Sequence, residues 1–475
     1  MNAGSTPSQS LFAPRDPVFP RRVSGRFRTL KWWMLGITLG IYYATPWIRW
    51  DRGPNLPDQA VLIDLAGRRF FFFWIEIWPH EFYFVAWLLI MAGVGLFLFT
   101  SVLGRVWCGY ACPQTIWTDL FILIERAIEG DRNKRVRLWN APMSVRKLRV
   151  RTAKWTAWLA ISVCTGGAWV FYFADAPALF IALVTFSAHP IAYASVGILT
   201  ATTFVLGGFM REQVCIYMCP WPRIQAAMMD ENSITVAYRP WRGEPRGKHR
   251  KAKGSENLGD CIDCEACVNV CPMGIDIRNG HQLECISCAL CIDACDDVMN
   301  RIGKPRGLVD YLSLNDERLK ATSSSLGSLA KQVLRPRVLL YSAIWSGIGV
   351  ALVVALFTRP DIEFSVAAVR NPINVLLSDN SIRNSYVFRI RNRQNESRSF
   401  RISLSSTEDF DLMVAGSSES VATINADETA QVRIHVTTDP GSPAARRDNT
   451  SLRFWVEDAL SGERAAADSV FRGRP

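Results

Sequence analysis

The chain lacks several common cofactor-binding patterns. It contains no C-x-x-C-H haem attachment sequence, so we expect no covalently bound haem. It contains no G-x-G-x-x-G loop in a strand–helix context, which argues against a bound nicotinamide nucleotide. Residues 1–30 lack the apolar core and cleavage site of a signal peptide, so the first apolar segment is expected to remain as an anchor.

Charged residues are scarce over long stretches of the chain. The chain has 475 residues, so we expect it to form several domains. Hydrophobic residues make up 49% of it, and a bilayer-spanning helix needs roughly 20 of them in succession. Because one chain carries five charge-free runs, we predict an integral membrane protein rather than a protein with buried core helices. The predicted spans are Trp32–Ile48, Phe82–Gly104, Trp155–Ala174, Pro190–Met210 and Val338–Thr358.

The net charge of +11 suggests nucleic-acid binding at first, but its distribution favours a membrane orientation. Loop 105–154 carries eleven basic groups against four acids, whereas loop 49–81 carries four against five. By the positive-inside rule, the N-terminus and residues 211–337 lie in the cytoplasm and the segment after Thr358 lies outside. We therefore predict a bacterial inner-membrane protein with a periplasmic C-terminal domain, basic loops against anionic lipid and no nucleic-acid partner.

Eight of the thirteen cysteines form two copies of C-x2-C-x2-C-x3-C, 24 positions apart. In bacterial ferredoxins with this pattern, three thiolates of each run bind one [4Fe–4S] cluster and the fourth binds the other cluster. Zinc is the alternative, but a zinc site uses four thiols and needs no third Cys at this spacing. The predicted ligand sets are Cys261, Cys264, Cys267 and Cys295 for one cluster, and Cys285, Cys288, Cys291 and Cys271 for the second.

Two further cysteine pairs form an internal repeat. The second predicted span ends in GRVWCGYACPQT and the fourth in REQVCIYMCPWPRIQ, so each is followed by an Arg and a C-x3-C-P motif. On a helix, positions i and i+4 share a face, and the Pro after each pair should break that helix. We expect the thiols of Cys108, Cys112, Cys215 and Cys219 to converge at the cytoplasmic edge of the membrane.

Such a thiolate set favours Cu(I), zinc or iron–sulfur chemistry, and the spacing leaves open whether the thiols bind a metal or cycle through disulfides. Cysteine as a small apolar filler is the other reading, and we adopt it for Cys164 in the third span. We also consider His80 and His281 as metal ligands, but we expect an interfacial and a solvated side chain, respectively. Residues 119–129 suggest an amphipathic interfacial helix.

The last part of the chain has a different sequence pattern from the membrane and ferredoxin regions. Residues 361–475 contain short alternating runs, at 385–391, 400–404, 431–436 and 451–456, separated by turn residues. This pattern is typical of an immunoglobulin-like β-sandwich, here without cysteines and therefore without a disulfide.

The order of these features resembles the FixG/CcoG family, accessory proteins for assembly of the cbb3-type cytochrome c oxidase. The resemblance rests on CGYACPQT, CIYMCPW, the double ferredoxin run, a fifth span and the terminal sandwich. It implies a cupric reductase that supplies Cu(I) to the oxidase, with transient copper on Cys108, Cys112, Cys215 and Cys219 as the redox site. It also implies oxidase subunits or assembly factors and copper chaperones as partners, and a cytoplasmic or quinol electron donor.

Two other functions remain open. A quinol dehydrogenase subunit of periplasmic nitrate reduction carries similar spans and C-x3-C-P pairs but should lack the sandwich. A non-redox assembly scaffold would keep the clusters as structural groups.

The predicted fold class is therefore a multi-domain membrane protein with an α-helical core of five spans, a 2[4Fe–4S] ferredoxin-like domain and an immunoglobulin-like β-sandwich. The predicted boundaries are 1–30 for a cytoplasmic tail, 31–210 for the four-span core, 211–337 for the ferredoxin domain with a linker at 239–257, 338–358 for the fifth span and 359–475 for the sandwich. Residues 1–25 are expected to be disordered.

Overall fold

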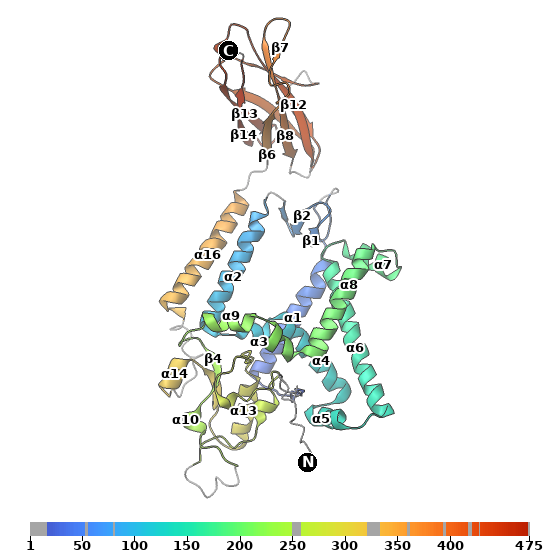
Figure 1. The fold of residues 1–475 in the computed structure, drawn as a ribbon, viewed down its shortest axis with the longest axis vertical. Helices are drawn as coiled ribbons and strands as arrows, with labels where there is room; N and C mark the ends of the chain where they lie inside the picture. Colours follow the sequence, from blue (N-terminus) through green and yellow to red (C-terminus); the bar gives the residue numbers. More distant parts are fainter. Residues whose placement is uncertain are drawn as a thin grey trace, which may run out of the picture. The chain divides into compact units, whose positions relative to one another are not determined.

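The computed structural model describes residues 17–52, 56–78, 81–248, 258–320, 333–358, 362–392, 396–416, 420–426 and 428–473. The chain divides into two compact units (Figure 1), one of residues 1–48 and 59–350 and the other of residues 49–58 and 351–475. The predicted ferredoxin domain thus forms one unit with the helical core. His80 lies outside the described residues.

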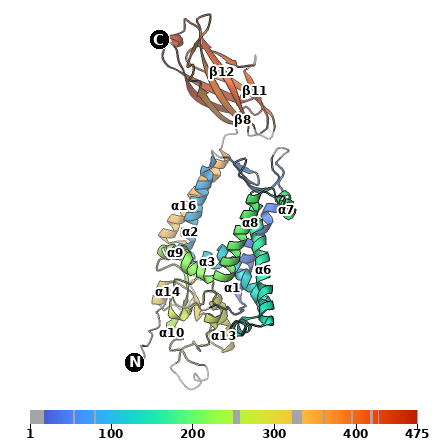
Figure 2. The ribbon, with the colours of Figure 1, turned by 45° about the vertical axis from the view of Figure 1, so that its right-hand side comes forward.

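Among the described residues, three helices are long and apolar enough to cross a membrane. They are α2 (Tyr83–Leu103), the helix formed by α8 (Pro190–Thr203) with the π-helical turn Phe204–Met210, and α16 (Pro336–Phe357). Figures 1 and 2 both show α2 beside α16. The ring of Tyr341 lies 6.2 Å from that of Phe97 across this contact.

The other two predicted spans do not meet the same criteria. The run Trp32–Ile48 falls in α1 (Arg26–Ala44), which begins with basic residues and ends before Pro46. The run Trp155–Ala174 falls in α6 (Val145–Val170), whose first ten residues include five Arg or Lys. Both helices therefore begin with charged turns before their apolar part. Of the five predicted spans, three meet these criteria within the described residues.

Shorter helices connect these long ones. Helix α4 contains the predicted amphipathic segment but begins six residues earlier, and it buries Asp119 and Glu125 as well as Phe121. Arg28 of α1 donates two hydrogen bonds of 2.9 Å to Asp119, so a buried ion pair joins these helices. The remaining elements are α3 (Val106–Tyr110), α4 (Pro113–Glu129), α5 (Arg132–Asn140), α7 (Ala176–Val184), the π-helical turn Val214–Met218 and α9 (Trp221–Met228).

An antiparallel three-stranded meander, which the sequence reading did not predict, follows α1. Its strands are β1 (Val61–Asp64), β2 (Arg69–Phe72) and β3 (Ile75–Ile77). Phe70, Phe71 and Phe72 lie in β2, where Phe71 is buried.

The ferredoxin region is organised around the antiparallel pair β4–β5 and the helix α13. Buried apolar residues of all three elements form one cluster with the cysteines, including Val236, Ile292 and Tyr311. Its elements are β4 (Thr235–Tyr238), α10 (Pro240–Gly243), α12 (Ala266–Asn269), the 3-10 turn Ile277–Asn279, α13 (Leu290–Arg301), β5 (Val309–Leu312) and α14 (Leu314–Arg318).

Two segments predicted to lack order are partly fixed in place. Residues 17–25 lie against the ferredoxin region and the helical core, because Arg21 N donates to Asn269 O at 2.7 Å and Arg22 N to the Asp131 carboxylate at 3.0 Å. The start of the predicted linker forms α10, where Arg242 bonds Asp260 at 2.5 Å. Residues 249–257, with His249, lie outside the described residues.

The second unit is an immunoglobulin-like β-sandwich, as predicted. One sheet has the order β10-β12-β8-β6, with β7 also paired to β8, and the other has the order β11-β9-β13-β14. Alternate residues of β8 and β13 point inward, and Tyr386, Phe388 and Phe454 are fully buried. The strands are β6 (Ile362–Ala368), β7 (Val375–Leu376), β8 (Ile382–Asn392), β9 (Arg398–Ser405), β10 (Asp411–Val414), β11 (Val421–Ile424), β12 (Thr429–Thr438), β13 (Thr450–Asp458) and β14 (Arg464–Phe471), with a short helix α17 (Pro443–Arg446).

Candidate functional site

The two C-x2-C-x2-C loops have the same unusual backbone conformation. In each loop the residues immediately before and after the middle cysteine have positive φ angles: 54° at Asp263 and 56° at Glu265, then 52° at Ser287 and 59° at Ala289. Alternation of right-handed and left-handed residues turns successive N–H groups toward one concave side, which suits anions such as the sulfides of iron–sulfur clusters. The backbone of both loops therefore fits a [4Fe–4S] cluster.

The structure also brings the thiols together in two crossed sets. Cys295 lies within electrostatic range of Cys261, Cys264 and Cys267. The fourth cysteine of the first run, Cys271, lies in a small cavity of about 20 Å³, which Cys267 also lines, with the three cysteines of the second run, Cys285, Cys288 and Cys291. These are the two sets that the spacing predicts, and their roles as ligands stay a prediction.

Burial makes these thiols poor acids on their own. It raises the pKa of Cys267 and Cys271 to about 12 and that of Cys285 to about 11. A thiol with such a pKa is protonated at neutral pH, and metal binding must displace its proton. Among the described residues, no three His, Cys, Asp or Glu side chains are close enough to hold a single metal ion.

The two C-x3-C-P motifs share one local fold. In both copies the second cysteine donates its backbone N–H five residues back, from Cys112 to Trp107 O at 2.9 Å and from Cys219 to Val214 O at 2.8 Å. Each of these cysteines then becomes extended, and a proline follows at or before the start of the next helix. The helix break is confirmed, but the paired thiols do not lie on one continuous helical face as expected.

All four of these cysteines line one cavity. Its volume is about 690 Å³, and its walls come from α2, α3, α9, α16 and the turn before each proline. Trp345 of α16 and Ile286 of the second cluster loop also line it. The structure therefore brings Cys108, Cys112, Cys215 and Cys219 together, although not in the geometry of ligands around a single ion.

Among the thiols of this four-thiol cavity, that of Cys108 is the most deeply buried and is held by a hydrogen bond. Its Sγ donates a hydrogen bond to Gln225 Oε1 at 3.0 Å, and the fully buried Gln225 donates in turn to Thr100 Oγ1 at 3.4 Å. Burial raises the pKa of Cys108 and that of Cys215 to about 12, so both are neutral thiols without a bound cation.

The cavity lies directly against the second cluster loop. Tyr110 Oη donates to Cys288 O at 3.1 Å, and a Cβ at Gly109 would lie only 2.6 Å from Ile286 O. Arg105 donates to the carbonyl groups of Leu283 and Pro222, and to Cys285 O at 3.3 Å. Cys108 and Cys288 belong to one apolar cluster of buried side chains, against which Ala266 and Cys271 of the first cysteine run also pack.

Sequence reasoning missed the residues that make this contact. Tyr110 and Gln225 carry no spacing signal. Arg105 belongs to the internal repeat, but its bonds to the second loop were not predicted, and only the Gly within CGYACP hints at a close approach. His281, expected to be solvated, is half-exposed and hydrogen-bonds Glu317 at 2.7 Å and Thr235 at 3.3 Å.

Comparisons with known proteins agree with this layout. Three family profiles match: a 4Fe-4S binding domain over residues 83–129, a 4Fe-4S dicluster domain over 210–314 and an IG-like fold at the C-terminal of FixG over 352–474. The nitrogen fixation protein FixG of Rhizobium meliloti is 51% identical over 97% of this chain and 93% of its own length.

This chain belongs to the FixG family. Two other relatives, RdxB and RdxA of Cereibacter sphaeroides, are 62% and 58% identical over 100% and 98% of this chain and over 100% and 99% of their own lengths. The 4Fe-4S binding domain profile that matches residues 83–129 covers the motif with Cys108 and Cys112. Membership thus accounts for the 4Fe-4S domains and for the immunoglobulin-like domain.

Proposed function

We propose that this FixG-family protein is a membrane-bound electron-transfer protein that reduces Cu(II) to Cu(I) at the four-thiol cavity. The single observation that carries the proposal is the shared cavity of Cys108, Cys112, Cys215 and Cys219, which Ile286 of the second cluster loop also lines. Thiolate ligands prefer the cuprous ion over the cupric ion, so a four-thiol pocket favours the reduced product.

The residues of the two loops would hold two [4Fe–4S] clusters in the crossed sets described above. When bound, such clusters supply single electrons, and one electron per copper ion balances the reduction of Cu(II) to Cu(I). The chain supplies the rest of the chemistry. Cys108 and Cys215 release their protons when the cation binds, and Gln225 offers an acceptor that positions the Cys108 thiol.

The same proposal includes a topology and partners. We place five helices across a bacterial inner membrane, α1 and α6 included, with the ferredoxin region in the cytoplasm and the sandwich in the periplasm. The basic N-terminal turn of α6 supports this orientation. Copper chaperones and subunits or assembly factors of a cbb3-type oxidase are the proposed partners, and the electron donor is a quinol or a cytoplasmic reductant.

The test is anaerobic copper reduction by the full-length protein in detergent. We expect about eight iron atoms per chain, the content of two [4Fe–4S] clusters, in both the wild type and a variant with all four cavity cysteines changed to Ser. After reduction and addition of Cu(II), the wild type should form Cu(I) at least tenfold faster than this variant. Cys164→Ser is the matched control, because Cys164 is exposed on α6 and does not line the cavity.

Equal rates in the wild type and the four-Ser variant would refute the copper proposal. An iron content clearly above eight in the wild type, lost in the four-Ser variant, would instead assign the cavity to a further iron–sulfur group.

A further inference from the structure

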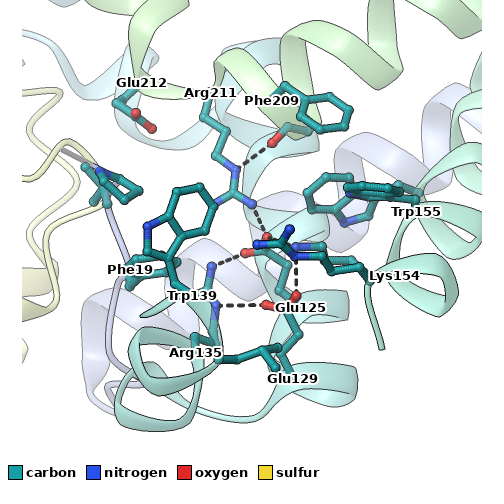
Figure 3. A pocket seen from close by; sticks show the side chains of 16 residues that line it. Phe19, Glu125, Glu129, Arg135, Trp139, Lys154, Trp155, Phe209, Arg211 and Glu212 are labelled. Atoms are coloured by element: carbon teal, nitrogen blue, oxygen red, sulfur yellow. Dashed lines mark hydrogen bonds and ion pairs between the residues drawn. The ribbon is translucent and has the colours of Figure 1, made fainter. Parts of the chain in front are cut away.

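A second cavity lies among α4, α5, α6 and the turn at Arg211 (Figure 3). Its volume is about 340 Å³, and no cysteine lines it. The described N-terminal segment closes one side, where Phe19 lies 6.0 Å from the ring of Trp139. The function proposed above makes no use of this cavity.

Charged side chains gather on one wall of this cavity. Glu125 pairs with Arg135 and Arg211, and Lys154 bonds Glu129 at 2.7 Å (Figure 3). These ion pairs already occupy both carboxylates. The lining as a whole contains four cationic side chains and three carboxylates, which leaves an excess of one positive charge.

Two of the cationic side chains can still bind a further anionic group. The Arg135 side chain is 1% exposed, and its Nη1 is buried without a hydrogen-bond partner among the described residues. A buried donor without a partner is destabilising, so a ligand that accepts its hydrogen bond is favoured. Arg151 is half-buried, lies 5.6 Å from the ring centre of Trp139 and forms no ion pair in the described part of the chain.

Aromatic side chains line the cavity beside these charged groups, and Lys154 Nζ lies 4.9 Å from the ring centre of Trp158. Trp139 is 52% exposed and Trp155 is 38% exposed, although both line the cavity. Indole rings that combine an apolar body with a polar N–H are typical of the membrane–water interface. Beyond Trp155, the exposed residues Leu159 and Val163 continue an apolar face along α6.

We propose that this cavity binds one anionic glycerophospholipid. Arg135 and Arg151 hold the phosphodiester, whose single negative charge balances the excess positive charge of the lining. The acyl chains follow Trp155 and the exposed apolar face of α6. The site rests on the membrane location proposed above, but not on copper or electron transfer, so the two proposals fail independently.

The test measures lipid bound to the delipidated full-length protein by native mass spectrometry. Phosphatidylglycerol, phosphatidylcholine and inorganic phosphate are the three probes. We expect one phosphatidylglycerol per chain, retained at least tenfold more strongly than phosphatidylcholine. Arg151→Gln should weaken this binding about tenfold, because it removes one charge-assisted hydrogen bond. Arg149→Gln, an exposed position on the same helix outside the cavity, is the matched control.

Iron content equal to the wild type shows that both variants are folded. Equal retention of phosphatidylglycerol and phosphatidylcholine, or equal loss in the Arg151 and Arg149 variants, would overturn the proposal. Binding of inorganic phosphate that competes fully with phosphatidylglycerol would also overturn it, since the cavity would then recognise a free anion.

Discussion

The two cluster loops have the same cysteine spacing and the same backbone conformation, yet their surroundings differ. The first loop is fastened within the ferredoxin region, where Arg278 bonds Asp263 at 2.6 Å, and its Cys264 is exposed. The second loop is fastened to the helical core, where Tyr110 bonds Cys288 O at 3.1 Å, and its Cys288 is buried.

The spacing of the cysteines therefore determines which group a loop can bind, and the packing around the loop determines what that group can reach. The first loop is accessible to a donor from solvent, because one of its thiols is exposed. The second loop contributes Ile286 to the wall of the four-thiol cavity. We therefore expect electrons to enter at the first cluster and leave at the second.

Of the changes that test this difference between the two loops, Gly109→Ala is expected to have the largest effect. A Cβ there would lie 2.6 Å from Ile286 O and 3.0 Å from the Cα of Cys288, and both atoms belong to backbone. Overpacking of this kind typically costs 1–3 kcal/mol, and here the second loop must move. Gly109→Ala should therefore lose the second cluster, with iron falling from about eight to about four atoms per chain.

Iron and sulfide analysis with EPR of the reduced protein checks this outcome. Gly93→Ala is the control, because a Cβ at Gly93 in α2 meets no atom within 4 Å. Full iron content in the Gly109 variant would mean that the tight contact does not hold the loop.

A smaller pair of changes should separate the two loops. Tyr110→Phe removes one hydrogen bond to the second loop and should lower the free energy of unfolding by about 1 kcal/mol, with the clusters retained.

Arg278→Gln removes a positive charge beside the first loop and should lower the reduction potential of the first cluster by tens of millivolts. A denaturation curve checks the stability of Tyr110→Phe, and an EPR-monitored redox titration checks the potential of Arg278→Gln. A shift in the potential of the same cluster in both variants would contradict the assignment of each contact to its own loop.

Part of this site was readable from the sequence because spacing along the chain encodes it. Two repeats of C-x2-C-x2-C-x3-C predicted the crossed grouping of Cys271 and Cys295 that the structure contains. The repeat of C-x3-C-P likewise predicted a shared site for four distant thiols. The strands of the sandwich were predicted because inward residues alternate along β8 and β13.

Other features depend on contacts that no local pattern records. The docking of the second loop uses backbone groups of Ile286 and Cys288, which carry no residue-specific signal. The order of residues 17–25 arises from bonds to Asn269 and Asp131, far away in the chain. The bounds of α1 and α6 also differ from the predicted runs, because both helices begin in the charged residues that precede the apolar run.

The most direct test of the account compares two proteins that each lack one cluster. Cys264→Ser should disable the first cluster and Cys288→Ser the second, while all four cavity thiols remain. After chemical reduction and addition of Cu(II), stopped-flow spectroscopy measures how fast the remaining cluster is reoxidised. We predict that Cys264→Ser retains the wild-type rate within about threefold and that Cys288→Ser is at least tenfold slower. Equal rates in the two variants, or faster reaction in Cys288→Ser, would contradict the claim that the second cluster serves the four-thiol cavity.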